Sequence, residues 1–167
     1  MKKIIYPPLL LILALFSTSC SNNKTDTKQE VVIDLSKEES SIKEVLRTYK
    51  ETLESLDVSE SFRLFTEDSE VLEQGKIEGT YRDYIANHIG PELGHFESFK
   101  FSDYEISVLV DLPYAFTTET YVYNIVLKED SRIVERKAAA TSVLKKIDGN
   151  WRIIKTHSSS RATKKTP

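Results

Sequence analysis

Hydrophobic residues between positions 42 and 56 recur every three or four positions, which is the spacing of one face of an α-helix. Ser36 followed by Glu39 has the spacing of a capping box, so the pattern predicts a helix that begins at Ser36. Asp57 should end this helix and cap a short second one that carries Phe62 and Phe65. The members of the apolar stripe are Ile42, Val45, Leu46, Tyr49, Leu53 and Leu56.

A third helix is predicted to start at Thr80, where Thr80 and Asp83 again have capping-box spacing. The pair Gly90-Pro91 should end it, because glycine and proline are typical of a helix terminus. One stripe of this helix contains Tyr81, Tyr84, Ile85, His88 and Ile89.

From Phe96 onward the hydrophobic period changes from three or four to two, which indicates β-strands. Phe99 and Phe101 alternate on odd positions, and Tyr104, Ile106, Val108 and Val110 alternate on even positions, so the phase slips at Ser102-Asp103. Such a slip predicts a β-bulge, which would bend a long strand.

Further strands are predicted over 115–127, 133–146 and 151–159, with a weaker short strand over 70–74. Asp148-Gly149 has the composition of a two-residue hairpin turn between the last two long strands. Helices followed by a meander of long, bent antiparallel strands predict an α+β fold, with the helices on one face of a curved sheet.

The chain starts as a secretory signal does, with Lys2-Lys3, an apolar run over 4–16 that is interrupted by Pro7-Pro8, and then small residues. This segment is too short for a membrane span. Small residues followed at once by Cys20 resemble the lipobox of bacterial lipoproteins, in which the cysteine is acylated and becomes the first mature residue. That resemblance implies a lipid-anchored protein of the bacterial cell envelope. An ordinary cleaved signal with an incidental cysteine is the alternative.

Four segments follow from these patterns. They are a signal peptide over 1–19, an acylated Cys20 with a polar tether over 20–35, one domain over 36–160 and a disordered tail over 161–167. Removing the signal with its two lysines changes the formal charge from −3 to −5. An acidic mature chain argues against nucleic-acid binding. Because acylation uses the single cysteine, no thiol is left for a disulfide, a metal or a nucleophile.

The closing stretch over 141–159, with the turn Asp148-Gly149 before Trp151, resembles the last hairpin of the nuclear transport factor 2-like superfamily in its SnoaL-like branch. The same hairpin resembles the association domain of calcium/calmodulin-dependent protein kinase II. Leu56-Asp57 followed by 65–68 resembles the turn after the family's first helix. The resemblance implies a cone, in which a curved antiparallel sheet wraps around N-terminal helices and leaves a pocket at its open end. The family includes enzymes, ligand binders and dimerisation modules.

The inner face of the sheet can be predicted from the hairpin registers, because cross-strand partners share a face. A turn at Glu129-Asp130 pairs Tyr123 with Arg136, Tyr121 with Ala138 and Glu119 with Ala140. A turn at Asp148-Gly149 pairs Ala140 with His157 and Leu144 with Ile153. The predicted inner face contains Glu119, Tyr121, Tyr123, Ile125, Val134, Arg136, Ala138, Ala140, Leu144, Trp151, Ile153 and His157.

Polar residues on this face are the candidate site. Arg136 needs a partner if it is buried, either from the protein or from an anionic ligand. Glu119 and His157 would lie roughly 9–10 Å apart across Ala140, a separation that suits a small ligand or a water molecule. His88 could reach the pocket mouth from the third helix. The predicted ligand-binding residues are Tyr84, His88, Tyr121, Tyr123, Arg136 and His157.

Three functions remain open from the sequence. The first is binding of a small, partly apolar molecule without catalysis. The second is an isomerase or cyclase that uses His157 and Glu119 as acid and base. The third is an interaction module that forms a homodimer through the open sheet face. No motif with metal-ligand or phosphate-loop spacing is present, so no metal or cofactor is expected.

Overall fold

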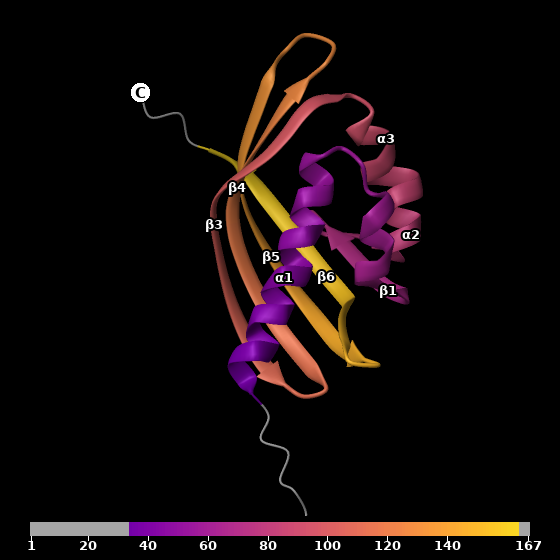
Figure 1. The fold of residues 1–167 in the computed structure, drawn as a ribbon. Helices are drawn as coiled ribbons and strands as arrows, with labels where there is room; N and C mark the ends of the chain where they lie inside the picture. The colour runs from indigo at the N-terminus through magenta and orange to yellow at the C-terminus, as the bar shows by residue number, and fades with distance from the viewer. Residues whose placement is uncertain (1–33, 164–167) are drawn as a thin grey trace, which may run out of the picture. The chain divides into compact units, whose positions relative to one another are not determined.

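The fold consists of one long helix and several short helical turns against a six-stranded sheet (Figure 1). It is taken from a computed structural model that describes residues 34–163. The helices are α1 (Leu35–Glu54), η1 (Ser59–Leu64), α2 (Tyr81–Tyr84), the π-helical η2 (Ile85–Ile89) and α3 (Gly90–Leu93). The strands are β1 (Phe65–Glu73), β2 (Lys76–Gly79), β3 (Phe96–Asp111), β4 (Tyr114–Leu127), β5 (Ile133–Ile147) and β6 (Asn150–Ala162).

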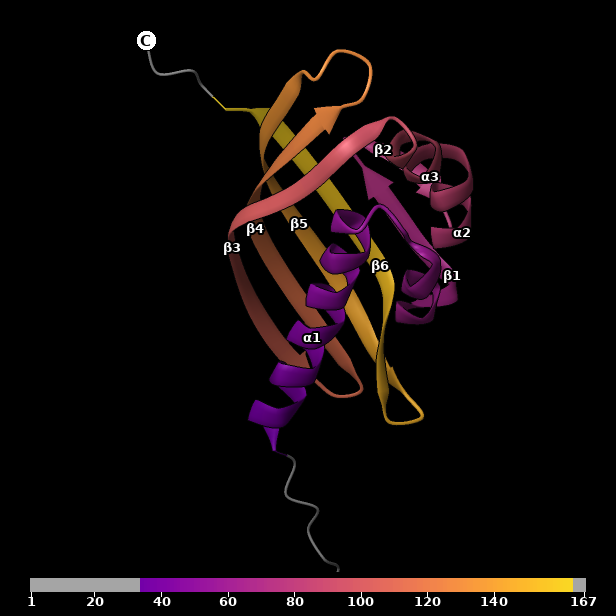
Figure 2. The ribbon, with the colours of Figure 1, turned by 45° about the horizontal axis from the view of Figure 1, so that its top comes forward.

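The predicted α+β class with a curved sheet is confirmed. The strands follow the order β2-β1-β6-β5-β4-β3, and α1 lies along the inner face of the sheet (Figures 1 and 2). All neighbouring strands are antiparallel except β1 and β6, which pair in parallel. Among the strands, β2 was not expected, β1 begins at Phe65 and not at position 70, and β6 extends to Ala162, into the expected tail. In the described part of the chain, no helix has both the length and the apolar character that a membrane crossing requires.

The N-cap of helix α1 lies two residues earlier than the capping-box pattern predicts. Asp34, not Ser36, is the N-cap, and its Oδ1 accepts hydrogen bonds from the backbone N–H groups of Ser36 (3.1 Å) and Lys37 (3.2 Å). Aspartate satisfies the free N–H groups of a first turn as well as serine does, so the earlier residue takes the position. The apolar stripe is confirmed, with Ile42 and Leu46 almost inaccessible to solvent.

The helical segment over 81–93 does not end at Gly90-Pro91, as the sequence predicts. The Thr80–Asp83 capping box is confirmed, but a π-helical turn follows and joins directly to α3. Gly90 closes that turn through its N–H to the carbonyl of Ile85, and a Cβ on Gly90 would lie only 2.2 Å from that oxygen. Pro91 then lies in the first turn of α3.

The predicted bulge in β3 is confirmed, because the pairing with β4 shifts between Ser102 and Glu105 and Asp103 has a positive φ of 50°. The predicted register of β4 and β5 is also confirmed. A second bulge, which the sequence did not predict, lies in β6. Val143 pairs with Lys155 but Leu144 pairs with Ile153, so one β6 residue is left over.

The β6 bulge reverses the faces of every later residue in the strand, because side chains alternate across a sheet. Ala140 therefore pairs with Ser158, and His157 pairs with Thr141 on the other face. The predicted pairing of Ala140 with His157 is wrong, while Leu144 with Ile153, nearer the turn, is confirmed.

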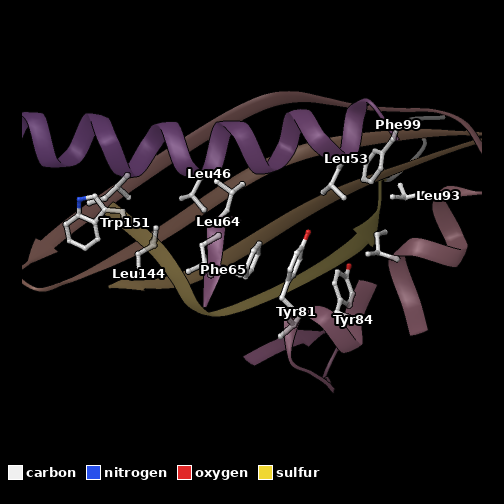
Figure 3. Packing of buried hydrophobic residues seen from close by; sticks show 14 of the residues in the cluster. Leu46, Leu53, Leu64, Phe65, Tyr81, Tyr84, Leu93, Phe99, Leu144 and Trp151 are labelled. Atoms are coloured by element: carbon white, nitrogen blue, oxygen red, sulfur yellow. The ribbon is translucent and has the colours of Figure 1, made fainter. Parts of the chain in front are cut away.

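The core lies between α1 and the inner face of the sheet and extends to the 81–93 segment (Figure 3). Tyr81 is its largest fully buried side chain. The Tyr81 ring stacks on Phe65 with a centroid distance of 3.6 Å, and its hydroxyl hydrogen-bonds to Ser61 Oγ at 2.5 Å. This aromatic packing fixes the helical segment that forms one wall of the site.

Candidate functional site

A cavity of about 110 Å³ lies between α1, the 81–93 helical segment and the inner face of the sheet. Its floor contains Ala138 and Ala140, the small residues that the sequence placed on this face. An apolar cavity of about 150 Å³ can hold one benzene molecule, so this smaller space suits a ligand with one small apolar group. The apolar part of the wall consists of Leu46, Leu53, Val71, Ile89, Phe96, Phe99, Phe101 and Ile125.

A buried ion pair lies in the wall of this cavity. Lys50 from α1 donates to Glu119 Oε2 on β4, and only 3% of the Glu119 side chain is exposed. The hydroxyl of Tyr104 donates to the same oxygen at 2.7 Å. Two donors on one carboxylate oxygen offset the cost of removing the charges from water. The bulge at Asp103 in β3 shifts the alternation of side chains, so that Tyr104 lies on the same face as Glu119.

Aromatic rings enclose the Lys50 ammonium. Its Nζ lies 4.6 Å from the ring centroid of Tyr104, 4.9 Å from that of Tyr121 and 5.8 Å from that of Phe101. Burial lowers the pKa of Lys50, and the carboxylate of Glu119 opposes this effect. Burial and the nearby Glu119 charge raise the pKa of Tyr104 and Tyr121, so both phenols stay protonated and able to donate. The cage therefore combines ring faces, a carboxylate and hydroxyl donors.

The other end of the cavity wall is acidic. Glu73 and Glu92 both contribute to the lining, and the hydroxyl of Tyr84 donates to Glu73 Oε2 at 2.7 Å. Burial is the main cause that raises the pKa of Tyr84. His88 lies just outside, with Nδ1 3.2 Å from Glu78 Oε1 and Nε2 3.4 Å from Glu92 Oε1.

Three of the predicted ligand-binding residues, Tyr84, Tyr121 and Tyr123, line the cavity. Arg136 does not line it. Its Nε donates to Ser160 Oγ at 2.8 Å and its Nη2 to the Ser160 carbonyl at 3.2 Å. Arg136 is half-buried, and its hydrogen-bonding partner comes from β6 of the same domain.

His88 and His157 are also outside the cavity lining. The β6 bulge turns His157 to the face opposite Glu119, and Ser158 takes the place beside Ala140. The predicted acid–base pair required Glu119 and His157 to lie on the same face of the sheet, and they lie on opposite faces. Glu119 remains in the site, but its immediate partners are Lys50 and Tyr104.

Sequence reasoning missed Lys50, Tyr104 and Glu73 as site residues. One signal was available, since Lys50 follows Leu46 by four positions and precedes Leu53 by three, within the apolar stripe of the first helix. A charge inside such a stripe indicates a buried partner. The pairing with Glu119 depends on residues 69 positions apart, so no local pattern shows it.

Solved structures of low sequence identity share this fold. A nuclear transport factor 2-like superfamily protein of Salmonella enterica matches with a TM-score of 0.68 and 18% identity, covering 80% of this chain and 96% of that one. A conserved protein of Planctomyces limnophilus matches with a TM-score of 0.68 and 17% identity over 77% and 99%. A hexachlorocyclohexane dehydrochlorinase of Novosphingobium barchaimii matches with a TM-score of 0.62 and 16% identity over 80% and 92%. These identities support the fold alone.

No curated protein matches the sequence. The family model of the SnoaL-like domain matches residues 42–163, from the middle of α1 to the end of β6. The match covers the strands and helices that form the cavity, and it agrees with the nuclear transport factor 2-like fold of the structural neighbours. The chain therefore belongs to the SnoaL-like domain family.

Proposed function

We propose that this domain binds a small, partly apolar molecule in its cavity without converting it, as part of a lipid-anchored protein of the bacterial cell envelope. The observation that carries the proposal is the cavity itself, whose lining combines aromatic and aliphatic side chains and a floor of Ala138 and Ala140 with carboxylates and with serine and threonine hydroxyls of β5 and β6. A concave, partly apolar space that also carries polar groups is typical of a small-molecule site.

The polar groups favour binding over catalysis. A general base must be free to accept a proton, whereas the Glu119 carboxylate already accepts from both Lys50 and Tyr104. The isomerase or cyclase alternative needs His157 close to Glu119, and the β6 bulge places His157 on the opposite face. The first hypothesis from the sequence is therefore the one that this geometry supports best.

The first prediction is that filling the cavity abolishes ligand binding. Ala140→Leu should remove the ligand-induced rise in melting temperature in a thermal-shift screen of small aromatic and aliphatic compounds, because its side chain would occupy the space above the floor. The neighbouring exposed residue provides the control, since Ala139→Leu adds the same atoms on the outer face. Equal responses of both variants would contradict the site, and no response from the wild type would contradict the function.

A homodimer is a second candidate, supported by one specific observation. Leu109 and Phe116 are cross-strand partners on β3 and β4 and are 66% and 44% exposed. Exposed apolar pairs of this kind are typical of contact surfaces. We expect the wild type to sediment as a dimer and Phe116→Glu as a monomer, with Ser59→Glu, at an exposed position of η1, as the control. A monomeric wild type would contradict this candidate.

The anchor rests on the N-terminal sequence, which lies outside the described residues. Cys20 precedes the start of α1 at Leu35 by fifteen positions, mostly polar. An extended chain spans about 3.3–3.6 Å per residue, so this tether would let the domain reach several tens of ångströms from the membrane.

A further inference from the structure

The charged side chains that line the cavity are not balanced. Among the described residues, the lining contains one ammonium, from Lys50, and three carboxylates, from Glu73, Glu92 and Glu119. Lys50 and Glu119 neutralise each other in a direct ion pair. Two carboxylates are left, and both belong to the acidic end of the wall.

Glu73 is the more buried of these two carboxylates, with 22% of its side chain exposed against 51% for Glu92. Within residues 34–163, no lysine or arginine nitrogen lies within 4 Å of Glu73; its close partners are the Tyr84 hydroxyl and His88 Nδ1 at 3.8 Å. A half-buried carboxylate that accepts a hydrogen bond from one neutral donor can still accept a hydrogen bond from a positively charged partner.

The aromatic lining of the cavity extends beyond the Lys50 cage. Phe99 lies 4.8 Å from Phe101 and 5.7 Å from Tyr123, measured between ring centroids, and all three rings line the space. Ring faces attract organic cations, and the cage around Lys50 already holds one alkylammonium against three rings and a carboxylate. The side chains of the cavity therefore already bind one alkylammonium group, which is the kind of group that an amine ligand carries.

We propose that the ligand is a small organic cation, an amine on an apolar body, whose charge lies against Glu73 and whose body lies among the aromatic rings. This inference rests on the proposed function and names the ligand class of the same cavity. It follows from the Glu73 carboxylate, which has no lysine or arginine partner among the described residues, and from the aromatic rings that line the same cavity.

Two nearby groups could oppose this charge preference. Arg136 is engaged with Ser160 and lies outside the lining. His88 is enclosed by Glu73, Glu78 and Glu92, and its charge would weaken the field if it were protonated.

The test compares three probes of similar shape and different charge: benzylamine, benzyl alcohol and benzoate. Each is titrated at about pH 8 against the full chain in mild detergent, and apparent affinity is taken from the rise in melting temperature. The wild type should bind benzylamine about tenfold more tightly than benzyl alcohol, which corresponds to about 1.4 kcal/mol, and benzoate least.

Glu73→Gln is the diagnostic variant, because the amide oxygen still accepts from Tyr84 while the charge is lost. It should bind benzylamine no better than benzyl alcohol and leave the affinity for benzyl alcohol unchanged. Glu67→Gln, an exposed position on the same strand, should behave as the wild type. The melting temperature without ligand checks that each variant folds.

The outcomes separate the two proposals. Binding of benzyl alcohol or benzoate with no preference for benzylamine overturns the cationic ligand and leaves the binding function standing. A benzylamine preference that persists in Glu73→Gln overturns the role of Glu73. No response to any of the three probes contradicts both proposals.

Discussion

Lys50→Met should destabilise the domain by about 3–5 kcal/mol, because it leaves the Glu119 carboxylate buried without its cation. The Tyr104 hydroxyl is then the one remaining close donor to the carboxylate oxygen that Lys50 contacted. Urea unfolding followed by the fluorescence of Trp151 measures the change in the free energy of unfolding. Trp151 is the single tryptophan and is buried, so its emission reports global unfolding.

A double-mutant cycle separates the ion pair from general damage to the core. Glu119→Gln alone leaves Lys50 without a counter-charge, whereas Lys50→Met with Glu119→Gln removes both charges together. We expect the double variant to lose less stability than the two single losses added, with a coupling energy of about 2 kcal/mol or more. Additive losses would contradict a coupled pair.

Lys43→Met is the matched control for this cycle. Lys43 is on the same helix and pairs with Glu39, but both side chains are 43% exposed. Exposed pairs contribute about 0–1 kcal/mol, so this change should be small. A loss as large as that of Lys50→Met would mean that burial of the pair is not the cause.

Cys20→Ser should move the protein from the membrane fraction to the soluble fraction in a folded state. Buried acyl chains contribute about 0.8 kcal/mol per CH₂, so several chains hold a protein firmly and their loss releases it. Fractionation followed by immunodetection measures the distribution, and the Trp151 unfolding transition shows whether the released domain is folded. Thr25→Ser, in the same polar segment, is the control and should stay membrane-bound.

A Cys20→Ser protein that remains in the membrane fraction would contradict the lipoprotein hypothesis. The apolar run over 4–16 would then be the anchor. The binding proposal for the domain would not change, because the cavity lies wholly within the described residues.

The two bulges show what the sequence can and cannot predict about this sheet. Around Asp103 the strand has apolar residues on both sides of the slip, so the change of phase is visible in the sequence. After Ile154 the residues of β6 are almost all polar. No hydrophobic alternation shows which of these residues face inward. Because of the bulge in β6, Ser158 faces the cavity and His157 faces the other side of the sheet.

The inner face of β4 and β5 was predictable because its register depends on one hairpin and one alternation. Glu119, Tyr121, Ala138 and Ala140 were therefore placed correctly. The contact of Lys50 with Glu119 depends on how α1 lies across the sheet. The hydrophobic periodicity of the sequence does not show that arrangement. The π-helical turn before Gly90 could not be predicted either, because glycine followed by proline is a common end of a helix.

Ligand-to-methyl nuclear Overhauser effects test the central claim, that the cavity is the ligand site, most directly. Ala138 and Ala140 point their methyl groups into the cavity, and Ala139 between them points outward. With a bound benzylamine or benzyl alcohol, we expect effects from the ring protons to the methyl groups of Ala138 and Ala140 and none to Ala139. Effects confined to Ala139, or to the exposed pair Leu109 and Phe116, would place the ligand on the outer face and contradict the account.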